Sequence, residues 1–237
     1  MDSGAFHTPD GVAVTAVTAA EMGAVDRIAV EAVGLSLLQM MENAGRNLAN
    51  QCRRLRTDGS VLIVAGAGGN GGGGLACARH LTNRDIPTAV VLDRDPSELE
   101  GATATQHRIL DAAGVPTTTE LPPLDDVGLV VDALIGYGLQ GAPRGRAAGL
   151  IETLAAEPVP TLSLDVPSGV DATTGETPGV VVEPAVTLTL ALPKTGLRGT
   201  SGELLLADIG IPPAVYRRLD VPYDTPFSTG FWVRLQQ

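Results

Sequence analysis

The stretch VLIVAGAGGNGGGGLACARHL, residues 61–81, joins an apolar run, a block of glycines and a helix-compatible segment. The run Val61–Ala65 leads into Gly66–Gly74, where seven of nine residues are glycine. Glycines adopt positive φ and let a ligand approach the bare backbone. The amides that open the following helix, Leu75–Leu81, supply donors and a partial positive charge. This order predicts an anion-binding loop; a flexible linker is disfavoured because linkers are not usually framed by a strand and a helix.

Outside this stretch the chain alternates between apolar runs and helix-like segments, a pattern typical of parallel strands joined by helices. Runs that suit buried strands lie at 61–65, 88–92, 128–131 and 161–164, and helix-like segments lie at 72–82, about 97–113 and 146–156. Two earlier helices are expected, one after the capping-box spacing Thr18–Glu21 and one from Ser36 to about Leu55. The expected fold class is α/β, a Rossmann-like doubly wound, mostly parallel sheet in a three-layer α/β/α sandwich.

A chain of 237 residues with 44% apolar content is expected to form one large domain. We assign residues 18–219 to this domain, residues 1–17 to a loose leader and residues 220–237 to a C-terminal tail. Beyond Asp171 the pattern predicts further strands at 180–182, 186–190 and 203–207 and a short helix near 213–219.

The charge of the chain argues against two classes of partner. A net charge of −11 disfavours a nucleic-acid surface and an anionic membrane surface. No apolar window of about 20 residues is present to span a membrane, and the N-terminal sequence does not resemble a signal peptide. Cys52 and Cys77 have no metal-like spacing. We therefore expect a cytoplasmic protein that binds neither nucleic acid nor membrane.

Two polar sites follow buried strands further along the chain. One strand ends at or near Asp132, before Gly136 and Gly138, and another ends at Asp165, three residues before Ser168. Each site alone reads equally well as a simple turn. Parallel strands bring their carboxyl ends to one edge of a sheet, where open α/β sheets bind ligands. We therefore expect these sites to join the glycine block in one pocket.

Lys194, in the sequence LPKTG, is the only lysine of the chain, beside 15 arginines. Isolated lysines are usually solvated surface groups. Whatever bias removed the other lysines left this one, so we expect it to have a functional role.

An NAD(P) oxidoreductase is the main alternative that the motifs leave open. Gly66–Gly71 fits G-x-G-x-x-G, and Asp93 ends the next strand, where a Rossmann protein holds the ribose. The match is weak because so dense a glycine run fits at several registers. The 27 residues from Gly66 to Asp93 also exceed the usual spacing of about 20.

The sequence carries no hydrolase or phosphate-loop signature. Ser168 lacks a G-x-S-x-G context, and no G-K-[ST] follows the glycines. The three histidines, His7, His80 and His107, are widely spaced and are expected to be structural or exposed.

Together these residues resemble the NAD(P)H-hydrate epimerases, also called the YjeF N-terminal domain, over roughly residues 18–212. The matching segments are Glu42–Gly45 (E-N-A-G), Gly66–Gly74 (G-x-G-N-N-G-G-D-G), Asp132–Leu139 (D-A-x-x-G-x-G-L), Asp165–Asp171 (D-x-P-S-G-x-D), Pro193–Gly196 (P-K-x-G) and the closing segment Gly202–Pro212. The segment that begins at Asp165 is the most specific of them.

Three positions depart from that family's pattern. Gly69 stands where an asparagine is usual, Gly73 where an aspartate is usual, and Tyr137 where a threonine is usual. The glycine at 73 removes a carboxylate expected beside the ligand. A non-catalytic nucleotide- or partner-binding module on the same fold is therefore the alternative function, ahead of the oxidoreductase.

The resemblance implies a substrate, a reaction and partners. The substrate is a hydrated nicotinamide cofactor, NADHX or NADPHX, and the enzyme interconverts its R and S forms at ring carbon C6. A separate NAD(P)HX dehydratase would repair the S form, and a homodimer is expected.

The resemblance also implies site residues. Loss of the C6 hydroxyl leaves a cation stabilised by the ring nitrogen, and Asp165 is the expected acid–base group, while Lys194 would donate a proton or hold a phosphate. One potassium ion per subunit would be held by Asn70, Asp132 and Ser168, hard oxygen donors that suit an alkali cation better than zinc. The substrate would lie against Gly69, Asn70, Gly71, Gly72, Gly73, Gly136, Tyr137, Gly138, Leu139, Gln140, Gly141, Ala142 and Asp165.

Overall fold

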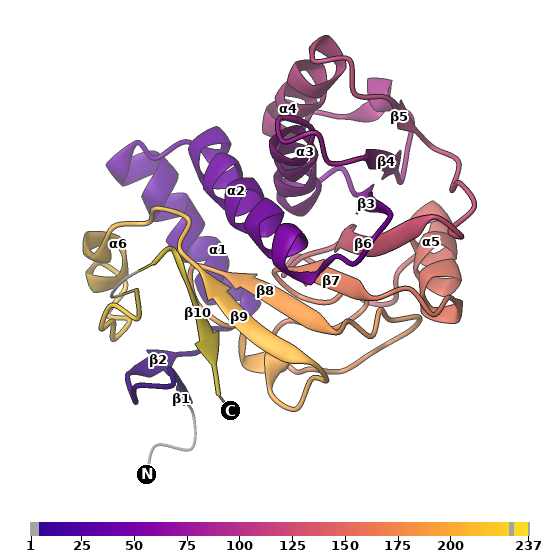
Figure 1. The fold of residues 1–237 in the computed structure, drawn as a ribbon. Coiled ribbons are helices and arrows are strands. Elements are labelled where there is room, and N and C mark those ends of the chain that lie inside the picture. The colour runs from indigo at the N-terminus through magenta and orange to yellow at the C-terminus, as the bar shows by residue number, and fades with distance from the viewer. Residues whose placement is uncertain (1–4, 228–229, 237) are drawn as a thin grey trace.

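An eight-stranded sheet lies at the centre of the computed structural model, which describes residues 5–227 and 230–236 (Figure 1). Its strands are β3 Ser60–Ala65, β4 Thr88–Leu92, β5 Thr117–Thr118, β6 Val127–Ala133, β7 Thr161–Leu164, β8 Val186–Leu190, β9 Glu203–Ala207 and β10 Trp232–Leu235. Their order is β10-β9-β8-β7-β6-β3-β4-β5, and each neighbouring pair is parallel except the antiparallel pair β9 and β10. The predicted mostly parallel, doubly wound sheet is confirmed.

The direction of the winding reverses beside β3. This strand pairs with β4 on one side, where Val61 lies opposite Thr88, and with β6 on the other, where Val61 lies opposite Leu129. The connections that leave β3 and β6 therefore diverge. In open α/β sheets the crevice beyond such a reversal is where ligands bind.

Helices cover both faces of the sheet and complete three layers (Figure 1). On one face lie α2 Leu37–Leu55, α3 Gly69–Thr82 and α4 Gly101–Ala112, and on the other lies α5 Gly145–Ala156. Successive strand side chains point to opposite faces. Ile63 accordingly packs in the cluster that contains α2 and α3, and Val64 packs in the cluster that contains α5. Burial on both faces explains why these strands read as continuous apolar runs.

Shorter elements complete the chain: α1 Ala19–Ile28, a π-helical turn Ala29–Val33, α6 Pro213–Arg217, and 3₁₀ turns Pro96–Glu98 and Thr195–Leu197. The capping box predicted at Thr18 is confirmed, since its side chain accepts from the Glu21 amide and the Glu21 side chain accepts from the Thr18 amide. Ser36 and Gln39 form a second capping box at the start of α2.

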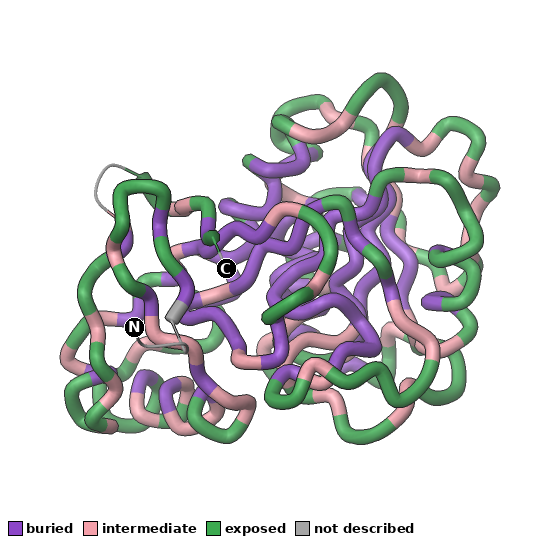
Figure 2. Tube along the Cα trace, turned by 90° about the horizontal axis from the view of Figure 1, so that it is seen from below, coloured by how far each residue is buried: buried purple, intermediate pink, exposed green. Residues whose placement is uncertain are grey.

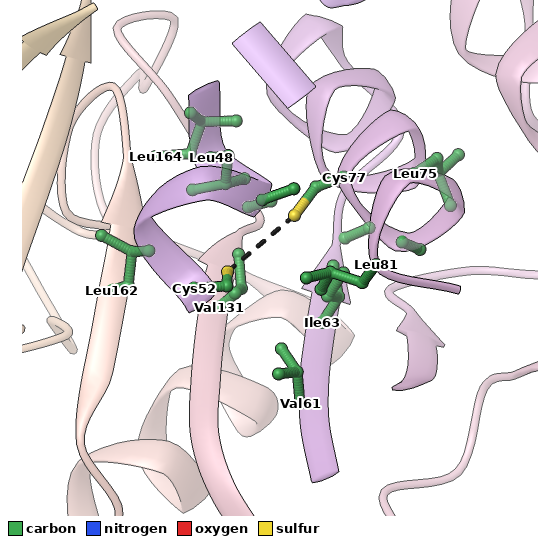
Figure 3. Close-up of a cluster of buried hydrophobic side chains, with 14 of the residues drawn as sticks. Leu48, Cys52, Val61, Ile63, Leu75, Cys77, Leu81, Val131, Leu162 and Leu164 are labelled. Atoms are coloured by element: carbon green, nitrogen blue, oxygen red, sulfur yellow. Dashed lines mark hydrogen bonds between the residues drawn. The ribbon is translucent and has the colours of Figure 1, made fainter. Parts of the chain in front are cut away.

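Helices α2 and α3 pack closely over the sheet. A Cβ added at Gly45 would lie 2.5 Å from the Cβ of Ala76, so only glycine fits between the helices there. Cys52 and Cys77 lie in the same cluster with their Sγ atoms 3.9 Å apart, among leucine and valine side chains (Figure 3). Both thiols are free and buried. Figure 2 shows the buried residues gathered in the middle of the molecule and the exposed residues along the surrounding segments.

Both ends of the chain differ from the sequence prediction. Within the expected loose leader, residues 5–15 form an antiparallel hairpin of β1 Ala5–His7 and β2 Ala13–Thr15, in which Phe6 and Val14 are buried, and residues 1–4 lie outside the described residues. The tail contributes β10, which extends the sheet beyond β9. These strands are too short to show the alternation of apolar and polar residues that identifies a strand in a sequence. The division of the chain at residues 17 and 219 stays a prediction.

Two internal segments also differ. Residues 180–182, expected as a strand, form none; the amide of Val182 donates instead to the carbonyl oxygen of Ser168 at 2.9 Å. Helix α3 begins at Gly69, three residues before the expected start at 72. The glycine block is therefore largely helical rather than a loop.

Candidate functional site

A cleft of about 760 Å³ opens beyond the carboxyl ends of β3, β4, β6 and β7. The loops that follow these strands, the start of α3, and parts of α1 and α2 form its walls. The predicted substrate-binding residues that line it are Gly69, Asn70, Gly136, Tyr137, Gly138, Leu139, Gln140, Ala142 and Asp165. Those that do not line it are Gly71, Gly72, Gly73 and Gly141. Its volume is in the range of small-molecule sites.

Asp165 is a buried residue that lines this cleft and forms an ion pair with Lys194. It follows the last residue of β7 in a left-handed conformation with φ of 68°. The Lys194 ammonium donates to Oδ1 of Asp165 and, at 2.9 Å, to the carbonyl oxygen of Leu190. The two side chains are 1% and 5% exposed. Buried charges persist in folded proteins when they are paired and hydrogen-bonded, as these are.

The two carboxylate oxygens of Asp165 have different partners. Oδ1 accepts from the Leu190 amide at 3.3 Å as well as from Lys194, and Oδ2 accepts from the Tyr137 amide at 3.2 Å. Asp165 lines the cleft, whereas Lys194 does not. A ligand would therefore contact the carboxylate, with the ammonium behind it.

Asp132 and Ser168 form a second buried cluster at the ends of β6 and β7. Ser168 Oγ donates to Asp132 Oδ1 at 2.6 Å, while Oδ2 accepts from the Ser168 amide at 2.9 Å and from Ser163 Oγ at 2.8 Å. Burial raises the pKa of Asp132, although these hydrogen bonds act in the opposite direction. Among the described residues, no ion pair involves Asp132.

Asn70 connects the start of α3 to the end of β7. Its Nδ2 donates to the carbonyl oxygen of Leu164 at 3.1 Å. A Cβ added at Gly136 would lie 3.2 Å from Asn70 Oδ1 and 3.1 Å from Asp165 Oδ2. Asn70, Gly136 and Asp165 therefore meet at one point of the cleft, and position 136 has little room for a side chain.

The glycines inside α3 permit close packing. A Cβ added at Gly72 would lie 2.6 Å from Met41, and one added at Gly74 would lie 2.7 Å from the Cβ of Ala133. At Gly73 it would lie 2.9 Å from Cδ2 of Leu164. Position 73 thus faces the core. Gly73 does not line the cleft, and the expectation that its missing aspartate deprives the ligand of a neighbouring carboxylate stays a prediction.

Asp26 also belongs to the cleft, and the sequence prediction missed it. It lies on α1, and its Oδ2 accepts a hydrogen bond of 2.5 Å from the Tyr137 hydroxyl. Burial raises the pKa of Asp26 and that of Tyr137. The available signal for Asp26 was a charged residue within an apolar helix face. That face has the spacing of Met22, Val25, Asp26 and Ala29.

Three arginines that the sequence prediction also missed, Arg94, Arg144 and Arg146, line the cleft. Arg94 donates to both carboxylate oxygens of Asp93, at 3.0 and 3.1 Å. Asp93 lines the cleft as well. Guanidinium groups in this position would suit the phosphates of a dinucleotide.

Residues 37–196 match the family described as YjeF-related protein N-terminus. The chain belongs to this family. It is 49% identical to the NAD(P)H-hydrate epimerase of Dehalogenimonas lykanthroporepellens, over 97% of this chain and 96% of that protein. It is 37% identical to the bifunctional NAD(P)H-hydrate repair enzyme Nnr of Hyperthermus butylicus, over 84% of this chain but 39% of that protein.

A solved structure shares the YjeF-related fold. The crystal structure of yeast ynu0 aligns with a TM-score of 0.81 at 25% identity, over 93% of this chain and 100% of that one. The alignment extends beyond residues 37–196. The YjeF-related fold therefore accounts for nearly the whole chain.

The remaining sequence candidates of this YjeF-related chain lie outside the cleft. His80 Nε2 lies 2.7 Å from Glu42 Oε1, and His107 Nε2 lies 3.0 Å from Thr117 Oγ1. Within residues 5–227 and 230–236 there is no group of three or more His, Cys, Asp or Glu side chains suited to a metal ion. In the same part of the chain, no helix is both long enough and apolar enough to cross a membrane.

Proposed function

We propose that this protein is an isomerase of metabolite repair that interconverts (6R)- and (6S)-NAD(P)HX. The observation that carries the proposal is the buried Asp165 carboxylate that lines the cleft and is paired with the buried Lys194 ammonium. A relative named NAD(P)H-hydrate epimerase, 49% identical over nearly the whole chain, supports it.

The reaction moves a hydroxyl group from one face of the ring to the other. A proton reaches the C6 hydroxyl, the C6–O bond breaks with its electron pair on the departing water, and the lone pair of N1 forms a C6–N1 double bond. Water then adds to the opposite face, the double-bond pair returns to N1, and the extra proton passes to a base. Atoms and charge balance without an oxidant or reductant.

Asp165 is placed to exchange that proton and to stabilise the ring cation. Its Oδ2 lies on the cleft side with the Tyr137 amide, and Lys194 engages Oδ1. The ammonium holds the carboxylate in position and balances its charge between turnovers. A fixed charge in a buried site stabilises a developing opposite charge more strongly than water would.

The phosphates of the substrate would bind at the mouth of the cleft. The first amides of α3, at Gly69 and Asn70, supply donors and the positive end of the helix dipole. Arg94, Arg144 and Arg146 supply positive charge around them.

We further propose that Asn70, Asp132 and Ser168 hold a potassium ion. Their oxygens are hard donors, and Asp132 is a buried carboxylate for which no cationic partner occurs among the described residues. When bound, the cation would offset that buried negative charge. Asp132 and Ser168 would then fix the ends of β6 and β7, and with them the loop that begins at Gly136.

The product would pass to a separate NAD(P)HX dehydratase. Relatives named bifunctional repair enzymes are longer, and this chain covers 39% of the one from Hyperthermus butylicus. We propose that the protein acts as a homodimer in the cytoplasm.

The proposal is tested by following the R/S ratio of (6R)-NADPHX with purified protein at neutral pH and with potassium present. Acceleration over the spontaneous rate, lost in Asp165→Asn and kept in the matched surface variant Asp85→Asn, is the expected result. Binding without acceleration would indicate a non-catalytic module on the same fold. Hydride transfer from NAD(P)H would indicate an oxidoreductase.

A further inference from the structure

We infer that Asp26, held by the hydroxyl of Tyr137, is a second proton-transfer group and serves the ring face opposite to that served by Asp165. The inference rests on the proposed epimerase function and adds a residue to it. To change faces, the hydroxyl group must gain a proton and leave one face of the ring as water. The water that adds to the opposite face must then lose a proton. Each face therefore needs its own proton-transfer group.

Tyr137 connects the two carboxyl groups. Its amide donates to Asp165 Oδ2 at 3.2 Å, and its hydroxyl donates to Asp26 Oδ2 at 2.5 Å. The carboxyl groups thus lie at the backbone end and the phenol end of one residue, and all three residues line the same cleft. They come from separate elements, Asp26 from α1 and Asp165 from the end of β7. A planar ring bound between them would present one face to each.

The surroundings of Asp26 suit a proton donor. Burial raises its pKa, while the Tyr137 hydrogen bond and the charge of Lys194 lower it and the charge of Asp165 raises it. A carboxyl group with a raised pKa keeps its proton closer to neutral pH. Lys194 Nζ also lies 5.7 Å from the centre of the Tyr137 ring. The phenol is therefore held between the ammonium and Asp26.

Helix α1 does not need this carboxyl group for its own structure. Its N-terminus is closed by Thr18 and Glu21, and its buried face is formed by Met22 and Val25. The Asp26 side chain instead accepts a hydrogen bond from the cleft residue Tyr137.

The proton balance closes over a cycle. In one direction Asp26 gives its proton to the departing hydroxyl and Asp165 takes a proton from the arriving water. In the other direction the roles exchange. Each turnover moves one proton between the two carboxyl groups, and solvent restores the starting state.

Inversion and oxygen exchange can be measured separately. Wild type and variants are incubated separately with (6R)-NADPHX and with (6S)-NADPHX in water enriched in a heavy oxygen isotope, and spontaneous rates are subtracted. Water that returns to the face it left exchanges the oxygen without inversion, whereas water that returns to the other face does both. Asp26→Asn is expected to lower inversion about 100-fold from both epimers. Oxygen exchange should continue from the epimer whose hydroxyl leaves on the Asp165 face and should fall together with inversion from the other epimer. Tyr137→Phe is expected to lower inversion about tenfold, the value of one hydrogen bond to a charged group.

Glu31→Gln, an exposed acid just beyond α1, is the matched control and should change neither rate. Thermal unfolding checks that each variant is folded. Unchanged inversion in Asp26→Asn would overturn the inference, as would an equal loss of inversion and exchange from both epimers. A wild type that neither inverts nor exchanges faster than the spontaneous reaction would instead remove the proposed function itself.

Discussion

Lys194 is buried against Asp165, and its ammonium donates to Oδ1 of that carboxylate. The only lysine of the chain thus forms an ion pair with the carboxyl group that follows β7. Removal of one member of a buried pair leaves an uncompensated charge, whereas replacement of both members is tolerated better. The pair should therefore behave as a unit in both stability and activity.

Lys194→Met is expected to lower the free energy of unfolding by about 3–5 kcal/mol, because Asp165 stays buried without its partner. The double variant with Asp165→Asn should lose less than the sum of the two single losses. Urea unfolding of the singles and the double measures this coupling. Strictly additive losses would contradict it. All three variants should be inactive.

Gly136→Ala is expected to reduce kcat/KM about tenfold. The added Cβ would displace Asp165 Oδ2 or Asn70 by a few tenths of an ångström, and misplacement of a catalytic group by about 1 Å lowers the rate about 100-fold. Steady-state kinetics with each epimer measures the loss. Gly149→Ala is the control, since nothing lies within 4 Å of its Cβ and α5 should gain about 0.5–1 kcal/mol. Equal activity of Gly136→Ala and wild type would show that the cleft is wider there.

Most strands of the sheet were predictable, β5 and β10 excepted, because a strand that is buried on both faces has a largely apolar sequence, as in Val61–Ala65. The polar strand ends were predictable for a related reason. Asp132 and Asp165 each stand directly at the end of such a run, and parallel strands bring those ends together.

The unpredicted features depend on partners distant in sequence. Phe6 is buried because the hairpin packs in one cluster with residues near both ends of the chain, Val17 and Leu235. Asp26 belongs to the cleft because Tyr137, 111 residues away, reaches its carboxylate. A local pattern can single out an unusual residue such as Asp26, but it does not identify a partner distant in sequence, so the role of a residue outside a motif emerges from the fold.

Potassium is expected to stabilise the protein. Exchange of tetramethylammonium chloride for potassium chloride at constant ionic strength should raise the free energy of unfolding by about 1.4 kcal/mol at a tenfold excess over Kd. Asp132→Asn should abolish the difference, because it removes the buried charge that the cation would offset. Asp85→Asn, an exposed aspartate, should keep it. An identical response of Asp132→Asn and wild type would argue against this site.

Gly73→Asp is expected to destabilise the protein by about 3–5 kcal/mol rather than to restore a catalytic group. Its Cβ would lie 2.9 Å from Leu164, so the carboxylate would enter the core. Gly69→Asn is the matched variant, because it also restores the residue usual in the family. No atom lies within 4 Å of the added Cβ, so the free energy of unfolding should hardly change. Urea unfolding separates the two. A Gly73→Asp variant that is stable and more active would place position 73 at the ligand.

Asp171 provides a pH-dependent contribution to stability. Its Oδ1 accepts from the amides of Thr173 and Thr174 at 2.9 and 2.8 Å, and these hydrogen bonds lower its pKa from 3.8, that of Thr174 most. A carboxyl group with a lowered pKa contributes stability above its unfolded pKa, and that contribution is lost as the pH falls through the folded value. Asp171→Asn keeps a neutral acceptor and mimics the protonated acid. Solvent screening limits the expected loss at neutral pH to less than about 1 kcal/mol. Urea unfolding at a series of pH values should show that the stability lost in Asp171→Asn shrinks toward zero below pH 3.8. A stability loss that stays constant with pH would indicate that the carboxylate charge contributes nothing.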